Sequence, residues 1–104
     1  MDKVALYVKL QAKKGKEKEV EKFLSDALTT VQEEPGTSTW FALRLGPSTY
    51  GIFDTFADGE GRQAHLSGKI AEAIQERSAE LFSQPPAIEQ ADVLAMKLPE
   101  VVQY

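Results

Sequence analysis

Alternating apolar and polar positions open the chain. From Val4 to Leu10 every second residue is apolar, which places Val4, Leu6, Val8 and Leu10 in one row. A period of two is typical of a β-strand with one buried face. We therefore expect a strand over residues 4–10, followed by a turn at Lys13-Lys14-Gly15.

Two later segments have the period of a helix. In the first, spacings of three and four connect the apolar residues Val20, Phe23, Leu24, Ala27, Leu28 and Val31. Pro35-Gly36 should end this helix, because proline disfavours the helical conformation in the residue before it. The second segment runs from about Arg62 to Phe82, and Gly68 is expected to kink or divide it.

Three further segments read as strands. Residues 39–45 and 50–56 are rich in aromatic and branched side chains, and Gly46-Pro47-Ser48-Thr49 between them has the composition of a four-residue hairpin loop. Such a loop would place Leu45 opposite Tyr50 and Phe41 opposite Asp54. Residues 88–98 alternate well enough to form a fourth strand, so the predicted order is β-α-β-β-α-β.

This order predicts one α+β domain over residues 1–104, with a ferredoxin-like four-stranded antiparallel sheet and both helices on one face. In the predicted register both faces of the hairpin carry large apolar groups. Trp40 and Phe53 lie on one face with Arg44, while Phe41 and Ile52 lie on the other with Asp54. Helices can cover only one face, and exposing the other would forfeit several kcal/mol at ~25 cal/mol per Å². We therefore expect a homodimer in which sheet packs on sheet.

Composition and charge exclude several classes of protein. The 104 residues carry a formal net charge of -4 and include no cysteine. An acidic chain offers no basic surface for nucleic acid, and the absence of cysteine rules out disulfides, a thiolate nucleophile and Cys-based metal sites. No apolar run is long enough to cross a membrane, and the first residues lack the apolar run of a signal peptide. We expect a cytoplasmic protein with neither nucleic acid nor membrane as partner.

Short motifs in this order resemble the antibiotic biosynthesis monooxygenase family, within the dimeric α+β barrel superfamily. They are Lys13-Lys14-Gly15, Glu34-Pro35-Gly36 before the second strand, Asp54 late in the third strand, and His65-Leu66 near the start of the second helix. The resemblance covers about residues 3–98. Where this chain has Asp54, the family more often has glutamate.

The resemblance implies a function. Members of the family include oxygenases that act on quinols and polyketide phenols without metal, flavin or haem, alongside proteins of no known activity. The chemistry it implies is deprotonation of the substrate to an electron-rich anion, electron transfer to dioxygen and radical recombination. Relatives that degrade haem use an asparagine with a tryptophan and a histidine, and this chain contains no asparagine. We therefore expect no cofactor.

His65 and Asp54 are the candidate catalytic residues. Histidine titrates near neutral pH, so His65 could remove a phenol proton or bind the resulting anion, although a lone histidine at a helix start is often a capping or packing group. Asp54 could orient His65 or bind a hydroxyl. Alternatively, it is a buried acid bonded to backbone amides or paired with a base. No companion residues indicate a metal site.

The candidate substrate-binding residues are aromatic, apart from one arginine: Trp40, Tyr50, Phe53, Tyr7 and Arg44. Flat rings suit an aromatic substrate, but filling the core is the commoner role of strand aromatics. Arg44 could bind an anionic substrate or form a salt bridge to a partner chain.

Two functional hypotheses follow. The first is a cofactor-independent monooxygenase that oxidises a small aromatic quinol or phenol with dioxygen. The second is a dimeric small-molecule-binding or stress-associated module of the same fold that performs no turnover.

Overall fold

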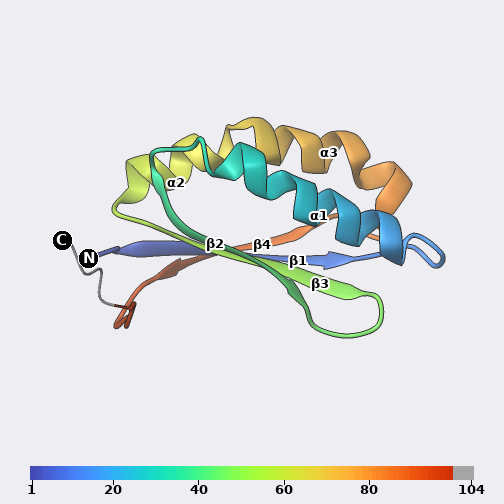
Figure 1. Ribbon diagram of the computed structural model, residues 1–104, viewed down its shortest axis with the longest axis horizontal. Helices are drawn as coiled ribbons and strands as arrows, with labels where there is room; N and C mark the ends of the chain where they lie inside the picture. The colour runs from blue at the N-terminus through green and yellow to red at the C-terminus, as the bar shows by residue number, and fades with distance from the viewer. Residues whose placement is uncertain (100–104) are drawn as a thin grey trace.

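A computed structural model describes residues 1–99 of the protein and shows seven elements (Figure 1). In chain order they are β1 (Val4–Gln11), α1 (Glu17–Val31), β2 (Thr37–Arg44), β3 (Thr49–Phe56), α2 (Gly59–Leu66), α3 (Lys69–Leu81) and β4 (Ala87–Asp92). The four strands form one antiparallel sheet in the order β2-β3-β1-β4. The predicted ferredoxin-like architecture is confirmed.

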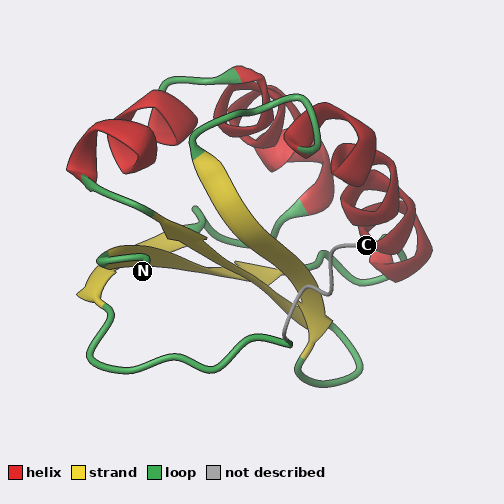
Figure 2. Cartoon of the chain, turned by 60° about the vertical axis from the view of Figure 1, so that its left-hand side comes forward, coloured by secondary structure: helices red, strands yellow, loops and turns green. Residues whose placement is uncertain are grey.

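Within residues 1–99 the three helices lie on one face of the sheet, and no helix of this part of the chain covers the opposite face (Figures 1 and 2). The core fills the space between these two layers. It contains the predicted β1 row of Leu6, Val8 and Leu10 and most of the predicted α1 stripe, with Val20 and Leu24 both buried. Leu28, which was predicted to belong to this stripe, is exposed. Burial of such side chains contributes about 1.5–3 kcal/mol each, so the helix layer is fixed to this face.

The second helical segment is two helices rather than one. The Asp58 side chain accepts a hydrogen bond of 3.0 Å from the backbone N–H of Gly61 and so caps the start of α2. Helix α2 ends at Leu66, and Gly68 is the N-cap of α3. The expected division at Gly68 is therefore confirmed, and the first of the two helices starts three residues earlier than predicted.

The fourth strand is shorter than predicted, because β4 ends at Asp92 and not at Leu98. Among the described strands its one neighbour is β1, whose first residue, Val4, pairs with Asp92. One further hydrogen bond joins the Val93 N–H to the Lys3 carbonyl at 2.9 Å. Beyond this point β1 offers no backbone for pairing, so the alternating pattern that continues toward Leu98 does not form a strand.

The predicted register of the hairpin is wrong by one residue. Arg44, rather than Leu45, pairs with Tyr50. The Leu45 N–H donates to the Thr49 carbonyl at 2.8 Å, so only residues 46–48 remain in the loop. A shift of one residue reverses the faces of one strand relative to the other.

The true register separates the hairpin side chains differently. Trp40 is opposite Asp54, and both face the helices, whereas Phe41 is opposite Phe53 on the open face. Asp54 therefore lies beneath the helix layer with Trp40 as its neighbour, not Phe41.

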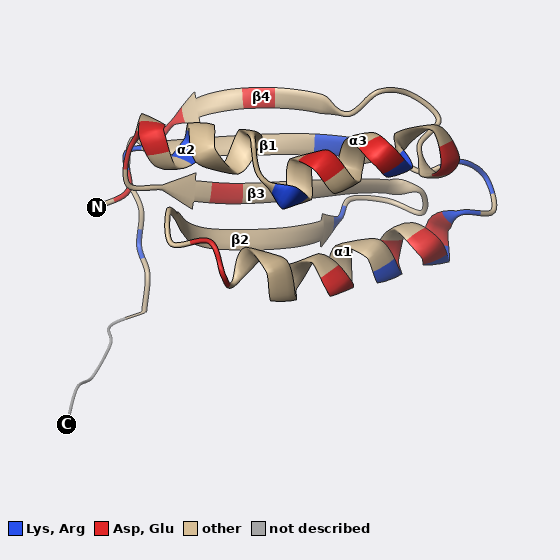
Figure 3. Cartoon of the chain, turned by 90° about the horizontal axis from the view of Figure 1, so that it is seen from above, with Lys and Arg blue, Asp and Glu red and all other residues tan. Residues whose placement is uncertain are grey.

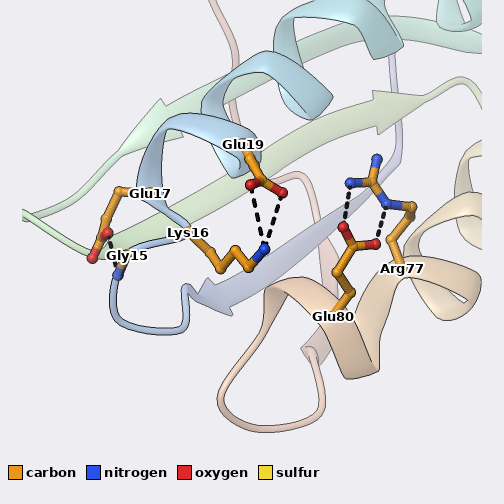
Figure 4. A network of polar contacts seen from close by, with 6 residues as sticks. All are labelled: Gly15, Lys16, Glu17, Glu19, Arg77 and Glu80. Carbon is orange, nitrogen blue, oxygen red and sulfur yellow. Dashed lines mark hydrogen bonds and ion pairs between the residues drawn. The ribbon is translucent and has the colours of Figure 1, made fainter.

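Acidic and basic residues recur along all three helices of the described chain (Figure 3). Lys16 and Glu19 are 3.3 Å apart, the Arg77 guanidinium lies 3.1 Å from Glu80, and the Gly15 N–H donates to Glu17 at 2.9 Å (Figure 4). These groups are exposed, and each such pair is worth about 0–1 kcal/mol. Among residues 1–99, no helix is long and apolar enough to cross a membrane.

Candidate functional site

Three ionisable side chains from three elements meet between the sheet and α2. Asp54 points from β3 toward the helices, His65 is the last residue but one of α2, and Glu34 lies in the loop between α1 and β2. The chain passes from Glu34 to Asp54 through β2 and β3, and from Asp54 to His65 through the cap at Asp58. We call these three residues the Glu34–His65–Asp54 array.

A carboxylate contacts each nitrogen of the His65 ring. The Nδ1 atom is 2.7 Å from Oε2 of Glu34 and 3.1 Å from its Oε1. The Nε2 atom is 2.9 Å from Oδ2 of Asp54. His65 is buried, and its ring packs on Phe56 with centroids 5.4 Å apart. The two carboxylates and the phenyl ring together fix the orientation of the imidazole.

Asp54 is 0% exposed and has no aligned hydrogen-bond donor among residues 1–99. Its contact with His65 is a close ion pair whose N–H does not point along the line to Oδ2. The neighbouring Trp40 Nε1 also has no acceptor within the described part of the chain. Because buried polar groups normally have partners, this position resembles a functional site more than a simple core position.

The environment of His65 raises its pKa above the ordinary value of 6.5. Burial acts in the opposite direction, because it penalises the charged ring. The contacts with Asp54 and then Glu34 favour the charged ring, and together they exceed the effect of burial. The array therefore favours the imidazolium form of His65.

His65 forms part of the wall of an apolar cavity of about 240 Å³ between the sheet and helices α2 and α3. We call it the inner cavity. Its walls are mainly aliphatic and come from Leu6, Val8, Ile52, Leu66, Ile70, Ala71, Ile74 and Ile88, closed at one end by Pro85 and Pro86. His65 and Gln75 are the polar side chains of this wall. Asp54 does not line the cavity, although its cross-strand neighbour Leu6 does.

His65 also lines a second cavity, of about 310 Å³, which we call the outer cavity. It is lined by His65, Glu34, Glu33, Lys69 and three glycines. The Glu34 side chain is 21% exposed, so it is the member of the array that reaches solvent. Sequence reasoning used Glu34 only as part of a turn motif and missed its role as a partner of His65. An acid just before a Pro-Gly turn was the available signal.

The aromatic residues predicted to bind substrate lie outside the lining of the inner cavity. Trp40 packs against the hydrophobic core beside α1. Tyr50 is buried, and its hydroxyl donates to Glu21 at 2.6 Å, while Arg44 also pairs with Glu21.

Tyr7 and Phe53 lie opposite each other on the open face of the sheet. The structure thus brings together His65 and Asp54 of the predicted site. The other five residues lie elsewhere: Trp40 and Tyr50 in or against the core, Arg44 exposed beside Glu21, and Tyr7 and Phe53 on the open face.

Within residues 1–99, no group of three or more His, Asp and Glu side chains could hold a metal ion. The three residues of the array do not converge on one point, because the two carboxylates flank opposite nitrogens of the ring.

Comparison with solved structures identifies the fold. A protein of unknown function from Nitrosomonas europaea is 52% identical to this chain and superposes on it with a TM-score of 0.94. The match covers 97% of this chain and 98% of the N. europaea protein. A candidate antibiotic biosynthesis monooxygenase from Caulobacter crescentus is 20% identical over 90% of this chain and 92% of its own, with a TM-score of 0.78. A second such candidate, from N. europaea, is 14% identical over 89% of this chain and 91% of its own, with a TM-score of 0.79.

The resemblance to the antibiotic biosynthesis monooxygenases is confirmed by these structures as a likeness of fold. At 52% identity over nearly its whole length, the chain belongs to the same family as the N. europaea protein of unknown function. Neither the protein-family models nor the curated proteins give a significant match to the sequence.

Proposed function

We propose that the protein is a cofactor-independent monooxygenase that oxidises a small phenol or quinol with dioxygen in the inner cavity. The observation that carries this proposal is the position of His65. Its imidazole is buried within the ionisable array and also forms part of the wall of a mainly aliphatic cavity. Apolar walls with few polar groups are typical of sites for small aromatic ligands.

The array supplies the proton chemistry that this reaction needs. In its neutral form His65 accepts the proton of the phenolic hydroxyl, and Glu34 and Asp54 stabilise the imidazolium that forms. The phenolate then gives one electron to dioxygen, and the two radicals combine. One oxygen atom becomes a second carbonyl on the ring and the other leaves as water, so phenol and dioxygen give quinone and water, with the substrate as the only reductant.

The size of the inner cavity limits the substrate. Pockets for drug-sized ligands have volumes of about 300–1,000 Å³, and the inner cavity at about 240 Å³ lies just below that range. A molecule of one or two rings therefore fits the proposal better than a polycyclic one. Gln75 offers an amide that can bind a second oxygen atom of such a substrate.

Oxygen uptake tests the proposal. We would measure dioxygen consumption over a panel of one- and two-ring quinols with the wild type and with His65→Ala, and confirm by circular dichroism that the variant is folded. We expect uptake with at least one quinol and a loss of about 100-fold or more without the base. Equal uptake by two folded proteins would remove His65 from the mechanism.

One observation favours a second candidate function, a binding module of the same fold without turnover. Both nitrogens of His65 are already in contact with carboxylates, so the ring could serve to hold α2 against the sheet. In that case a phenolic ligand would raise the melting temperature by mass action without any uptake of dioxygen.

We propose further that the working unit is a cytoplasmic homodimer formed through the open face of the sheet. Phe41 is 50% exposed there, Leu45 48%, and Leu43 and Phe53 37% each. Tyr7 adds a further ring to the same face. A contiguous apolar surface of this kind is unusual on a monomer, and a second copy of the chain offers a surface of matching chemistry.

A further inference from the structure

The loop that carries Glu34 and the helix that carries His65 touch through their backbones. The contact is made by two glycines, Gly36 in the loop and Gly61 in α2. A Cβ atom on Gly61 would lie 2.9 Å from the carbonyl oxygen of Gly36, and one on Gly36 would lie 3.1 Å from the Cα of Gly61. Neither approach leaves room for a methyl group unless the backbone moves.

These glycines are not required by their backbone conformation. Among residues 1–99 the only positive φ angle belongs to Gly15, so both Gly36 and Gly61 have dihedral angles open to any residue. An alanine at either position would instead clash with the opposite backbone. The requirement for glycine therefore concerns the distance between the loop and the helix.

The glycine contact lies one helical turn from the ionisable array. Gly61 precedes His65 by four residues, so the two positions share a face of α2. Gly36 follows Glu34 by two residues in the loop. The closeness of the two backbones is thus transmitted directly to the 2.7 Å contact between Glu34 and His65.

We propose that Gly36 and Gly61 are positioning residues whose backbone contact holds α2 close enough to the loop for Glu34 to engage His65. His65 faces Asp54 from β3 and Glu34 from the loop, and Glu33 and Lys69 are the other charged residues lining the outer cavity. An alanine at Gly61 would push α2 and the loop apart. Because Glu34 lies in this loop, its contact with His65 would then break.

The test is the titration of His65, the only histidine in the chain, followed by NMR of its ring protons in Gly61→Ala. We expect a lower pKa than in the wild type, because one of the two stabilising carboxylates is withdrawn. The matched control is Gly59→Ala, which makes the same change in the same helix where a Cβ would meet nothing within 4 Å. It should leave the titration unchanged.

A double-mutant cycle with Glu34→Gln separates positioning from general destabilisation. If the glycine acts through Glu34, the pKa of His65 in the double variant Gly61→Ala/Glu34→Gln equals its pKa in Glu34→Gln alone. The proposal would be overturned if the two substitutions lowered the pKa of His65 additively, or if His65 titrated in folded Gly61→Ala as it does in the wild type. Should Gly61→Ala not fold, Gly36→Ala takes its place in the cycle, because its closest approach of 3.1 Å demands a smaller shift.

This inference concerns the array and not the oxidation that we propose for it. The titration is read without substrate, so a wild type that consumes no dioxygen would refute the proposed function and leave the positioning role to be judged by the NMR result. Where oxygen uptake is found, its pH profile should move to lower pH in Gly61→Ala together with the pKa of His65.

Discussion

The Nε2 atom of His65 lies 2.9 Å from Oδ2 of Asp54, and no hydrogen-bond donor among residues 1–99 meets either oxygen of that carboxylate in alignment. This pair connects α2 to the middle of the sheet. Because Asp54 is completely buried, His65 compensates for water that the carboxylate would contact at the surface, and losing this partner would be costly. The stability and the ionisation of the site are therefore coupled.

Replacing Asp54 with asparagine should destabilise the protein by about 3 kcal/mol. Removal of one partner of a buried ion pair costs about 3–5 kcal/mol, and His65 can reduce the loss by giving up its proton. Urea unfolding at neutral pH measures the effect. Glu34→Gln is the comparison, and its smaller loss should reflect the partial exposure of that side chain. Equal stability of Asp54→Asn and wild type would show that the pair is not a structural element.

Stability should decrease as the pH rises above about 6.5. The folded state raises the pKa of His65, so the folded protein holds this proton more tightly than the unfolded chain does. The stabilisation is fully present below the unfolded pKa of about 6.5 and is lost as the pH passes through the higher folded pKa. Unfolding free energies measured across this range check the sign. The slope should vanish in His65→Gln, and a stability that increases over this range would contradict the raised pKa.

Filling part of the inner cavity should weaken ligand binding. Ala71 lines this cavity from α3, and a phenyl ring at this position would occupy part of the 240 Å³. We expect Ala71→Phe to weaken the binding of one- and two-ring phenols by at least about tenfold, which corresponds to about 1.4 kcal/mol. Isothermal titration calorimetry measures the affinity. Ala79→Phe is the control, since Ala79 is an exposed residue of the same helix outside the cavity. Unchanged affinity in Ala71→Phe would place the ligand elsewhere.

A charge on the open face should separate the proposed dimer. Phe41 is half exposed there, and Phe41→Asp would place an unpaired carboxylate within the interface. Light scattering at micromolar concentration should give the mass of two chains for the wild type and of one chain for the variant. The control is Leu28→Asp, which changes a similarly exposed apolar residue on α1. A wild type with the mass of one chain would refute the dimer.

The sequence predicted the helices and strands well where local periodicity is strong. The row from Leu6 to Leu10 and, apart from the exposed Leu28, the stripe from Val20 to Val31 formed as expected, because apolar residues at a regular period are buried together in the matching secondary structure. The hairpin register was missed for a different reason. One hydrogen bond between Leu45 and Thr49 shortens the loop by a residue, and composition does not distinguish a loop of three residues from one of four.

In the candidate site, too, some residues could be predicted from the sequence and others could not. His65 and Asp54 could be selected mainly because they stand in motifs that resemble the antibiotic biosynthesis monooxygenases, and also because a single histidine and a strand acid within an apolar segment are chemically conspicuous. Glu34 could not be selected in this way. The chain has many acids, and only the packing of the loop against α2 brings this one to the imidazole. The aliphatic wall of the inner cavity was equally hidden, since its residues are indistinguishable in sequence from those of the core.

By itself, then, the sequence determined the order of the elements, the face on which each helix is apolar, and the identity of two ionisable residues of the site. Local spacing and side-chain chemistry are sufficient for these. Only the tertiary structure decided that Trp40, rather than Phe41, stands beside Asp54, that Glu34 completes the array, and that His65 lines two cavities. These outcomes depend on the register of two strands and on the closeness of two backbones, which are set by contacts between residues distant in the chain.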